Sequence, residues 1–247
     1  MESVSLFILQ QTLQQNVSNG AKNIKAAIWI LSNSEWNYST MTAQDVQNEY
    51  DALAPTYDKR WDAYLSSTHK VALQLLDPQK SDSILDVSAG TGLLAQKIVP
   101  FLGKKGRLTL VDISPGMLKV ARKRLQSCSC VDILEHDVHN LSFKSESFTK
   151  VLSVSALHYY KNPKKVLQEI HRVLQPKGAL ILVAWSRDTF LFKIFSVLLK
   201  IMKRNIVKIH TQKELKKLLA QTGFHVNETT RWSQGVWSLM AVKATKK

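Results

Sequence analysis

Cysteine is scarce in this chain of 247 residues, which contains only Cys128 and Cys130. Because the two lie two positions apart, they cannot join distant segments, and this excludes a fold held together by disulfide bonds. Their Cys-x-Cys spacing has no second pair, so we expect no metal site. The hydrophobic content of 45% and the length fit one globular domain with additions.

Long hydrophobic runs are also missing. No stretch approaches the roughly 18–20 consecutive apolar residues that a membrane-spanning helix needs. The short apolar runs at 6–9 and 26–31 do not follow a basic segment, as a secretory signal would. The sequence therefore favours a reducing, cytoplasmic location.

Acidic residues are few: 19 Asp and Glu stand against 34 Lys and Arg, a net charge of +15. From Arg187 onward there are 13 basic and three acidic residues, whereas residues 1–40 are neutral. Such a positive C-terminal quarter suits an anionic partner, namely a membrane surface, an acidic substrate or nucleic acid. Plain solubility is the alternative explanation.

The chain divides near residue 40. Residues 1–40 are rich in Gln, Asn and Ser, and we interpret them as an extension of uncertain order. Residues 41–247 form the predicted domain. Its first part, 41–77, is expected to be a helical cap, because Tyr50, Tyr57 and Trp61 recur at helical spacing.

Apolar runs then alternate with helical patterns, which predicts right-handed βαβ units and a parallel sheet. The predicted strands are 83–87, 107–112, 131–136, 148–154 and 179–184, with helices at 92–102, 115–126 and 163–174. A helix at 211–222, with a capping box at Thr211, precedes two more strands at 225–232 and 236–243. The expected fold is α/β: a seven-stranded mixed sheet, mostly parallel, with a C-terminal antiparallel hairpin and helices on both faces.

The most informative segment is ILDVSAGTG at 84–92, which predicts a buried strand, a glycine turn and the start of a helix. Glycines let the backbone come close to a ligand and leave N–H groups pointing at it. Asp112 follows Gly92 by 20 residues, where a carboxylate can hold a ribose. The spacing of Gly90, Gly92 and Ala95 also satisfies the dinucleotide fingerprint, so a nicotinamide-dependent oxidoreductase remains open.

Three acids, Asp86, Asp112 and Asp137, lie at the ends of three successive predicted strands. Open α/β sheets bind ligands at this edge. Each acid alone could merely cap a helix or a turn. Together they favour a site for a nucleoside-containing ligand.

At these residues the chain resembles class I S-adenosylmethionine-dependent methyltransferases of the methyltransferase type 11 group. Within that group it is similar to the ubiquinone/menaquinone-biosynthesis C-methyltransferases. The resemblance covers roughly 45–243. The segments that carry it are YDALAPTYDKRWDAY (50–64), ILDVSAGTG (84–92), LVDISPGML (110–118), EHDVHNLSFKSESF (135–148), SALHYYKNPKKVLQEIHRVLQPKGALIL (155–182) and TQKELKKLLAQTGF (211–224).

The resemblance implies a Rossmann-like fold and S-adenosylmethionine as cofactor. It implies that Asp86 orients the glycine turn and the methionine ammonium, that Asp112 accepts from both ribose hydroxyls, and that Asp137 accepts from the adenine amine. The full set of implied cofactor-binding residues is Tyr57, Asp86, Ser88, Ala89, Gly90, Gly92, Asp112, Ile113, Met117, Asp137, Val138 and Ser153.

The remaining implied roles involve packing and backbone contacts. Val138 would donate its backbone N–H to the adenine, beside which Ile113 and Met117 would pack. Ser153 would face the methionine end, and Tyr57 would cover the cofactor from the N-terminal side.

Two residues depart from the family pattern. Ser88 stands where the family usually has its first glycine; if its φ is ordinary, we expect weakened rather than abolished cofactor binding. Ser88 also keeps open a catalytically idle cofactor-binding module that acts through a partner. Thr149 replaces an acid, but it lies near a strand start, away from the cofactor edge, and should cost little.

Methyl transfer from a sulfonium is an in-line displacement, so alignment of the reacting atoms is the enzyme's main task. A base is needed only if the acceptor carries a proton that must leave. His158, just after the fourth strand, is the candidate base; a histidine that only packs in a loop is the alternative. The expected acceptor is a small molecule, apolar or lipid-like.

A long apolar and basic helix is expected at 189–209, with Lys193, Lys200, Arg204 and Lys208 on one face. It predicts either a peripheral membrane contact or a lid over 186–210. No nucleic-acid-binding module is recognisable. In the family, a particular tetrapeptide after the fourth strand marks amino-methylation of bases; SALH at 155–158 takes its place, which favours a small molecule over nucleic acid.

Overall fold

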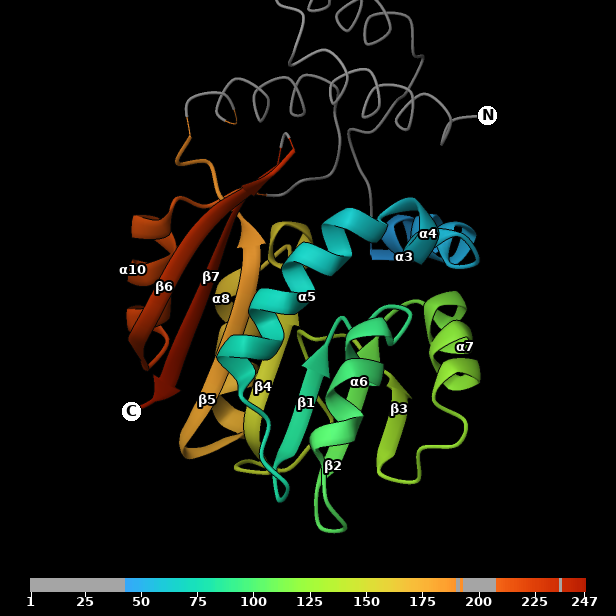
Figure 1. Cartoon of the computed structure of the whole chain (residues 1–247). Coiled ribbons are helices and arrows are strands. Elements are labelled where there is room, and N and C mark those ends of the chain that lie inside the picture. Colours follow the sequence, from blue (N-terminus) through green and yellow to red (C-terminus); the bar gives the residue numbers. More distant parts are fainter. Residues whose placement is uncertain (1–42, 190–191, 193–207, 236) are drawn as a thin grey trace, which may run out of the picture.

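The computed structural model describes residues 43–189, 192, 208–235 and 237–247. Its centre is a seven-stranded sheet in the order β3-β2-β1-β4-β5-β7-β6 (Figure 1). The first five strands are parallel, and β7 pairs antiparallel with both β5 and β6. The strands are β1 Ser83–Val87, β2 Arg107–Asp112, β3 Val131–Glu135, β4 Phe148–Val154, β5 Leu174–Trp185, β6 Phe224–Gln234 and β7 Trp237–Lys246. The predicted fold class is confirmed.

Helices cover both faces of this sheet (Figure 1). One face packs against Ala72 of α5, Leu94 of α6 and Ala121 of α7; the other packs against Val166 of α8 and Leu215 of α10. Each helix presents an apolar stripe to the strands, which is what holds such layers together. The helices are α3 Ala43–Leu53, α4 Tyr57–Arg60, α5 Asp62–Leu76, α6 Leu93–Ile98, α7 Pro115–Arg124, α8 Pro163–Val173 and α10 Gln212–Gln221.

The helical cap predicted at 41–77 contains three helices, α3, α4 and α5, in its described part. Pro55 restricts the preceding residue, and the chain turns there before α4 and α5 begin. The helix expected at 92–102 is also shorter, because a 3-10 turn with Pro100 follows Ile98. At the other end, the capping box of Thr211 and Glu214 is present as predicted.

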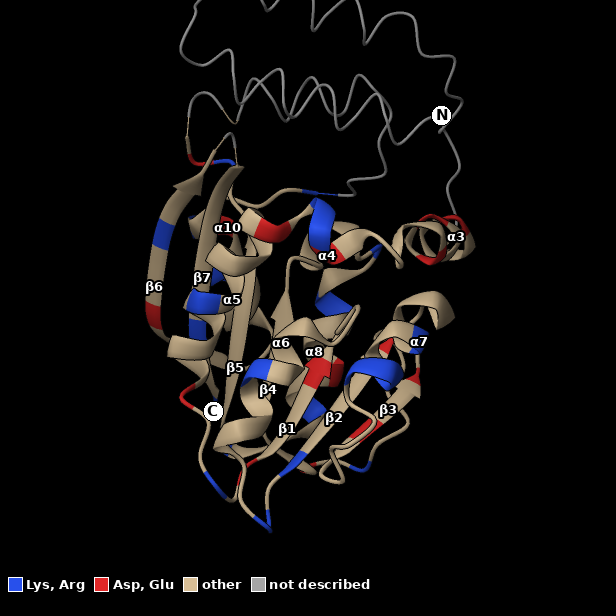
Figure 2. Cartoon of the chain, turned by 45° about the vertical axis from the view of Figure 1, so that its right-hand side comes forward, with Lys and Arg blue, Asp and Glu red and all other residues tan. Residues whose placement is uncertain are grey.

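The extension at 1–40 and most of the predicted helix at 189–209, namely 190–191 and 193–207, lie outside the described residues. Among the described residues, no helix is long and apolar enough to cross a membrane. Over the same part of the chain, Lys and Arg are spread over helices, β6 and the loops at the lower end of the sheet rather than gathered on one surface (Figure 2).

The order of the strands reverses between β1 and β4, because the chain builds outward from β1 to β3 and then returns to the other side of β1. At such a switch point the loops that leave the two central strands diverge and open a space at their carboxyl ends. The candidate site lies at this edge.

Candidate functional site

The glycine turn follows β1 and has a left-handed backbone at three positions, Ser88, Gly90 and Gly92, with φ values of 61°, 56° and 71°. A β-carbon on Gly92 would lie 3.1 Å from that of Ala121, so glycine is needed here for α6 to pack close to α7. A β-carbon on Gly90 would meet nothing within 4 Å. The open side of the turn is therefore at Gly90, where a ligand can approach the backbone.

Asp112 holds this turn. Its Oδ2 accepts the Gly90 N–H at 2.8 Å and its Oδ1 accepts the Ser114 N–H at 2.9 Å. Burial raises the pKa of this carboxyl, and the backbone donors of Ser114 and Gly90 oppose that rise. Two carboxylate oxygens offer about four acceptor positions, so Asp112 can still accept from the hydroxyls of a ligand.

Asp86 was expected to orient the glycine turn; in the structure it is Asp112 that accepts the N–H of Gly90. Asp86 is only 2% exposed. Burial, with the nearby charge of Asp112, raises the pKa of Asp86 well above its usual value. A cationic group of a ligand would relieve both effects, so Asp86 fits the ammonium of a bound amino acid.

Ser88 does not have the ordinary φ that would let serine fit the turn without strain. Left-handed backbone costs free energy for any residue with a β-carbon. The Ser88 Oγ lies 3.0 Å from the Oη of Tyr160, which in turn lies 2.9 Å from the Oγ of Ser153. The expectation that Ser88 only weakens cofactor binding assumed an ordinary φ, and the structure does not meet that condition. The strained serine instead belongs to a cluster of three hydroxyl groups.

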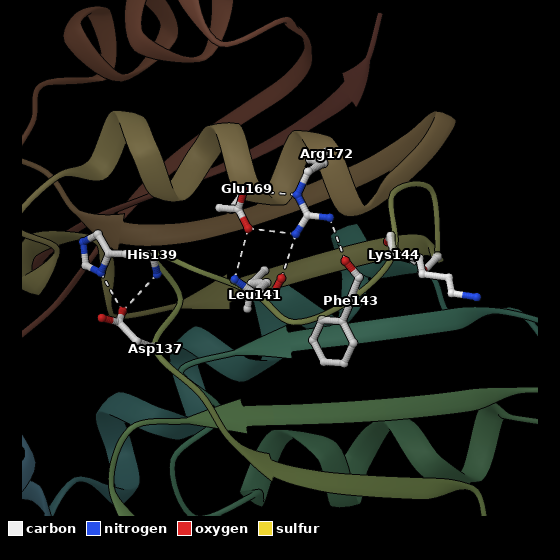
Figure 3. Close-up of polar contacts among 8 residues, drawn as sticks. Asp137, His139, Leu141, Phe143, Lys144, Glu169 and Arg172 are labelled. Atoms are coloured by element: carbon white, nitrogen blue, oxygen red, sulfur yellow. Dashed lines mark hydrogen bonds and ion pairs between the residues drawn. The ribbon is translucent and has the colours of Figure 1, made fainter.

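Asp137 lies in the loop after β3 and remains partly exposed. Its Oδ1 accepts from the backbone N–H of His139 at 2.9 Å and pairs with the His139 Nδ1 at 2.7 Å (Figure 3). These contacts outweigh its burial and lower the pKa of Asp137. The other carboxylate oxygen of Asp137, Oδ2, is thus left to accept a hydrogen bond from a ligand. The next residue, Val138, is buried.

Arg172 of α8 fixes the loop that carries Asp137 (Figure 3). Its guanidinium donates to the carbonyl oxygens of Phe143 at 2.6 Å and Leu141 at 2.7 Å, and Glu169 accepts the N–H of Leu141 at 3.0 Å. Glu169 and Arg172 also pair with each other at 2.8 Å. The sequence did not reveal this clamp, because its partners on the loop are backbone atoms.

The N-terminal helices are docked over the site by two acids. Asp51 of α3 accepts the Gly116 N–H at 2.7 Å and the Ser114 hydroxyl at 2.5 Å, at the start of α7. Asp58 of α4 pairs with Arg124 and accepts the Thr91 hydroxyl. These docking acids were also missed, since neither belongs to a sequence motif with a known spacing.

Tyr57, predicted to cover the cofactor, is the first residue of α4 and precedes Asp58. Its ring lies 5.9 Å from that of Tyr50. Burial raises the pKa of the Tyr57 hydroxyl well above its usual value, and the charge of Asp112 adds to that rise. Of the two residues expected beside the adenine, Met117 is buried in α7 and Ile113 is half-buried.

An aromatic cluster lies at the carboxyl ends of β4 and β5. The ring of His158 stacks on Trp185 with centroids 3.7 Å apart, and Trp185 stacks on Trp237 at 4.5 Å. Trp61 and Tyr64 meet Trp237 edge-on at about 6 Å. The cluster joins the N-terminal helices to the C-terminal hairpin.

His158 is 2% exposed, and neither ring nitrogen has a hydrogen-bond partner in the described structure. Burial lowers the pKa of His158 to about 3, so the imidazole is neutral at physiological pH. Buried polar atoms are normally satisfied, so an unpartnered ring at a strand end is a candidate ligand contact. Nowhere in the described segments do three or more His, Cys, Asp or Glu side chains gather as a metal site would require.

Residues 85–182 match the sequence model of a methyltransferase domain. The chain is 28% identical over 221 residues to the ubiquinone/menaquinone biosynthesis C-methyltransferase UbiE of Hydrogenovibrio crunogenus, covering 78% of this chain and 87% of the relative. It is 25% identical over 234 residues to that of Neisseria meningitidis, covering 83% and 96%.

Among solved structures, a chain of the complex between the Haloferax volcanii Trm112 methyltransferase activator and a methyltransferase superposes with a TM-score of 0.68. It is 20% identical, and the match covers 80% of this chain and 97% of that one. At that identity the likeness concerns the fold alone. The oxidoreductase and idle-module alternatives gain no support from these similarities.

Proposed function

Because the chain is a class I S-adenosylmethionine-dependent methyltransferase, we propose that it methylates a carbon atom of a small, lipophilic, ring-bearing acceptor such as a quinone precursor. The observation that carries this proposal is the similarity to C-methyltransferases of quinone biosynthesis, which spans most of both chains. The aromatic cluster around Trp185 supports it, because its rings give the carboxyl ends of β4 and β5 an apolar surface that suits a lipophilic acceptor.

The three acids are proposed to divide the cofactor between them. Asp112 accepts from the ribose hydroxyls with its remaining lone pairs, and Asp86 pairs with the methionine ammonium. Asp137 accepts from the adenine amine with the oxygen that His139 leaves uncommitted. A hydrogen bond accepted by a charged carboxylate is stronger than one between two neutral groups. Three carboxylates therefore suit a site that must hold a polar ligand.

Backbone and apolar contacts complete the proposed cofactor site. Val138 donates its N–H to the adenine, and Ile113 and Met117 pack beside it. Ser153 faces the methionine end from the end of β4, and Tyr57 covers the cofactor. Ser88, Ala89, Gly90 and Gly92 provide the turn over which the ligand passes.

When bound, S-adenosylmethionine would supply a sulfonium methyl group to the acceptor carbon, with S-adenosylhomocysteine as the leaving group and the proton of that carbon released to water. The protein contributes alignment, which alone can lower the barrier by several kcal/mol, roughly 7–11 in favourable intramolecular cases. The edges of Trp185 and His158, whose faces are stacked on each other, would border the acceptor ring and help to point its carbon at the methyl group.

His158 is proposed to act on the acceptor's oxygen. With a pKa of about 3 it is a weak base, so full proton removal by the unliganded imidazole is disfavoured. A neutral ring nitrogen can instead accept a hydrogen bond from a phenolic hydroxyl, which pushes electron density onto the ring carbon. Either role would give one of the two unpartnered nitrogens a function.

The test is product analysis with the full chain. We would supply S-adenosylmethionine with a hydroquinone that carries a short isoprenoid tail and no ring methyl, and in parallel with phosphatidylethanolamine vesicles. The proposal predicts a single added methyl on a hydroquinone carbon by mass spectrometry and NMR, reduced in His158→Asn. Methyl transfer to the lipid amine or to a hydroquinone oxygen instead would contradict it.

The C-terminal charge leads to a second, separate proposal: peripheral membrane contact through 189–209, by virtue of the basic residues at 193, 200, 204 and 208. Anionic lipids attract each such charge by about 1 kcal/mol near the surface. Flotation with anionic vesicles should recover the chain, and flotation with neutral vesicles should not. Equal recovery on both would contradict an electrostatic contact.

The domain division is likewise a proposal. If 41–247 is the methyltransferase domain, a chain that begins at Met41 should fold and bind S-adenosylhomocysteine as the full chain does. Loss of binding on removal of 1–40 would contradict this division and show that the domain includes residues of the extension.

A further inference from the structure

Serine at position 88 is conformationally costly, because its φ of 61° belongs to the left-handed region that glycine adopts without strain. Strain of this kind persists only where the surroundings over-determine the conformation. The neighbours of Ser88 must therefore contain something that holds it.

The hydroxyl of Tyr160 is that neighbour. It lies 3.0 Å from the Oγ of Ser88 and 2.9 Å from the Oγ of Ser153. Ser153 is opposite Val87 in the parallel ladder between β1 and β4, so the three hydroxyls bridge the two strands at the switch point. Tyr160 is 6% exposed, and burial raises its pKa to about 12, so it keeps its proton and can donate to one serine while accepting from the other.

The conformation of Ser88 sets the direction of the next two N–H groups. The Ala89 N–H donates to the carbonyl oxygen of Val111 at 3.0 Å, and the Gly90 N–H donates to Asp112 at 2.8 Å. If Ser88 relaxed to a negative φ, both N–H groups would turn away from these partners. Asp112 would then lose the contact that holds its carboxylate beside the glycine turn.

We propose that Tyr160 is a positioning residue for the cofactor: its hydroxyl, braced by Ser153, holds Ser88 in the left-handed conformation on which the glycine turn and Asp112 depend. Tyr160 acts through Ser88. The consequence is specific, because glycine at position 88 would adopt the same backbone with no hydroxyl to hold and would make Tyr160 dispensable.

The test is a double-mutant cycle on S-adenosylhomocysteine binding, measured by calorimetry with wild type, Tyr160→Phe, Ser88→Gly and the double variant. We expect Tyr160→Phe to raise the Kd about tenfold in the presence of Ser88, and by less than about twofold in the Ser88→Gly background. Ser88→Ala, which keeps the β-carbon and removes the hydroxyl, should weaken binding as Tyr160→Phe does. It tests the same contact if Tyr160→Phe folds poorly.

Tyr64→Phe is the matched control, because Tyr64 is another buried tyrosine whose hydroxyl meets a serine, Ser155, at 2.7 Å. Any effect of Tyr64→Phe should be the same with Ser88 and with Gly at position 88. Thermal unfolding without ligand, measured on each variant, separates binding from stability. The proposal is overturned if Tyr160→Phe weakens binding equally in both backgrounds, as loss of packing would, or if it leaves the Kd unchanged beside Ser88.

Discussion

The hydroxyl oxygen of Tyr64 lies 2.7 Å from that of Ser155, a residue 91 positions later in the chain. Tyr64 belongs to α5, and Ser155 follows β4 with a φ of 61°, the same left-handed strain as at Ser88. The Tyr64 hydroxyl also accepts the indole N–H of Trp185 at 2.9 Å. One phenol therefore ties α5 to the ends of β4 and β5, where the aromatic cluster is built.

Tyr64→Phe should destabilise the protein by about 1–3 kcal/mol, because it leaves the Trp185 indole N–H and the Ser155 hydroxyl without this partner. Urea unfolding would measure the change in the free energy of unfolding. A change below about 0.5 kcal/mol would mean that water or another group replaces the phenol, and that the tie contributes little.

Gly116→Ala should displace α3 without harming α7. A β-carbon there would lie 2.8 Å from the Cα of Asp51, and alanine is otherwise the better helix former. Loss of the two hydrogen bonds to the Asp51 carboxylate should lower the local opening free energy of α3 by about 1.5–3 kcal/mol. Hydrogen exchange of 43–53 should become faster, and S-adenosylhomocysteine should dissociate faster.

Lys119→Ala, on the exposed side of the same helix, is the control for Gly116→Ala. It should leave both rates unchanged. Unchanged exchange of α3 in Gly116→Ala would contradict the docking role of Asp51.

Arg172→Lys should loosen the loop that carries Asp137. A guanidinium reaches Leu141, Phe143 and Glu169 together, whereas a lysine ammonium is a point charge without that fork. We expect faster hydrogen exchange at 137–143 and an S-adenosylhomocysteine Kd raised about tenfold, which corresponds to roughly 1.4 kcal/mol. Arg122→Lys is the matched control, since within the described segments Arg122 makes one hydrogen bond, a long one of 3.5 Å to the Ile133 carbonyl oxygen at the surface. Equal effects of the two substitutions would contradict the clamp.

The sequence predicted the strands of the sheet well, because buried runs and crossover helices alternate with little ambiguity. The bounds of β1, β2 and β4 are those expected. The φ of Ser88 could not be predicted, since it depends on a tyrosine 72 positions away. Arg172 and Asp51 were missed for a related reason: they bind backbone atoms, which every residue offers and no motif records.

Protonation of His158 should make the protein sensitive to acid. Its pKa is about 3 when folded, against 6.5 for the exposed imidazole, so between these values the unfolded chain binds a proton that the folded chain does not. The buried neutral imidazole therefore makes its full contribution to the free energy of unfolding above pH 6.5. That contribution is lost as the pH falls toward 3. His69, with a pKa lowered to about 4 by burial, acts in the same direction.

His158→Asn should flatten this dependence by up to about 1.4 kcal/mol per pH unit, the value for one full proton, which is approached toward pH 5. Urea unfolding at several pH values from 5 to 6.5 would measure it. Parallel curves for wild type and variant would show that His158 titrates normally in the folded protein.

The central claim, that the edge of the sheet at β1, β2 and β4 is an S-adenosylmethionine site, is tested most directly by calorimetry. The full chain would be titrated with S-adenosylmethionine, S-adenosylhomocysteine and NADH, as wild type, Asp112→Ala and the control Asp132→Ala on the exposed side of β3. We predict micromolar binding of the two adenosyl ligands alone, unchanged in Asp132→Ala and weakened about 100-fold in Asp112→Ala, where two hydrogen bonds to a charged group are lost. Binding of NADH, or adenosyl binding that survives Asp112→Ala, would contradict the account.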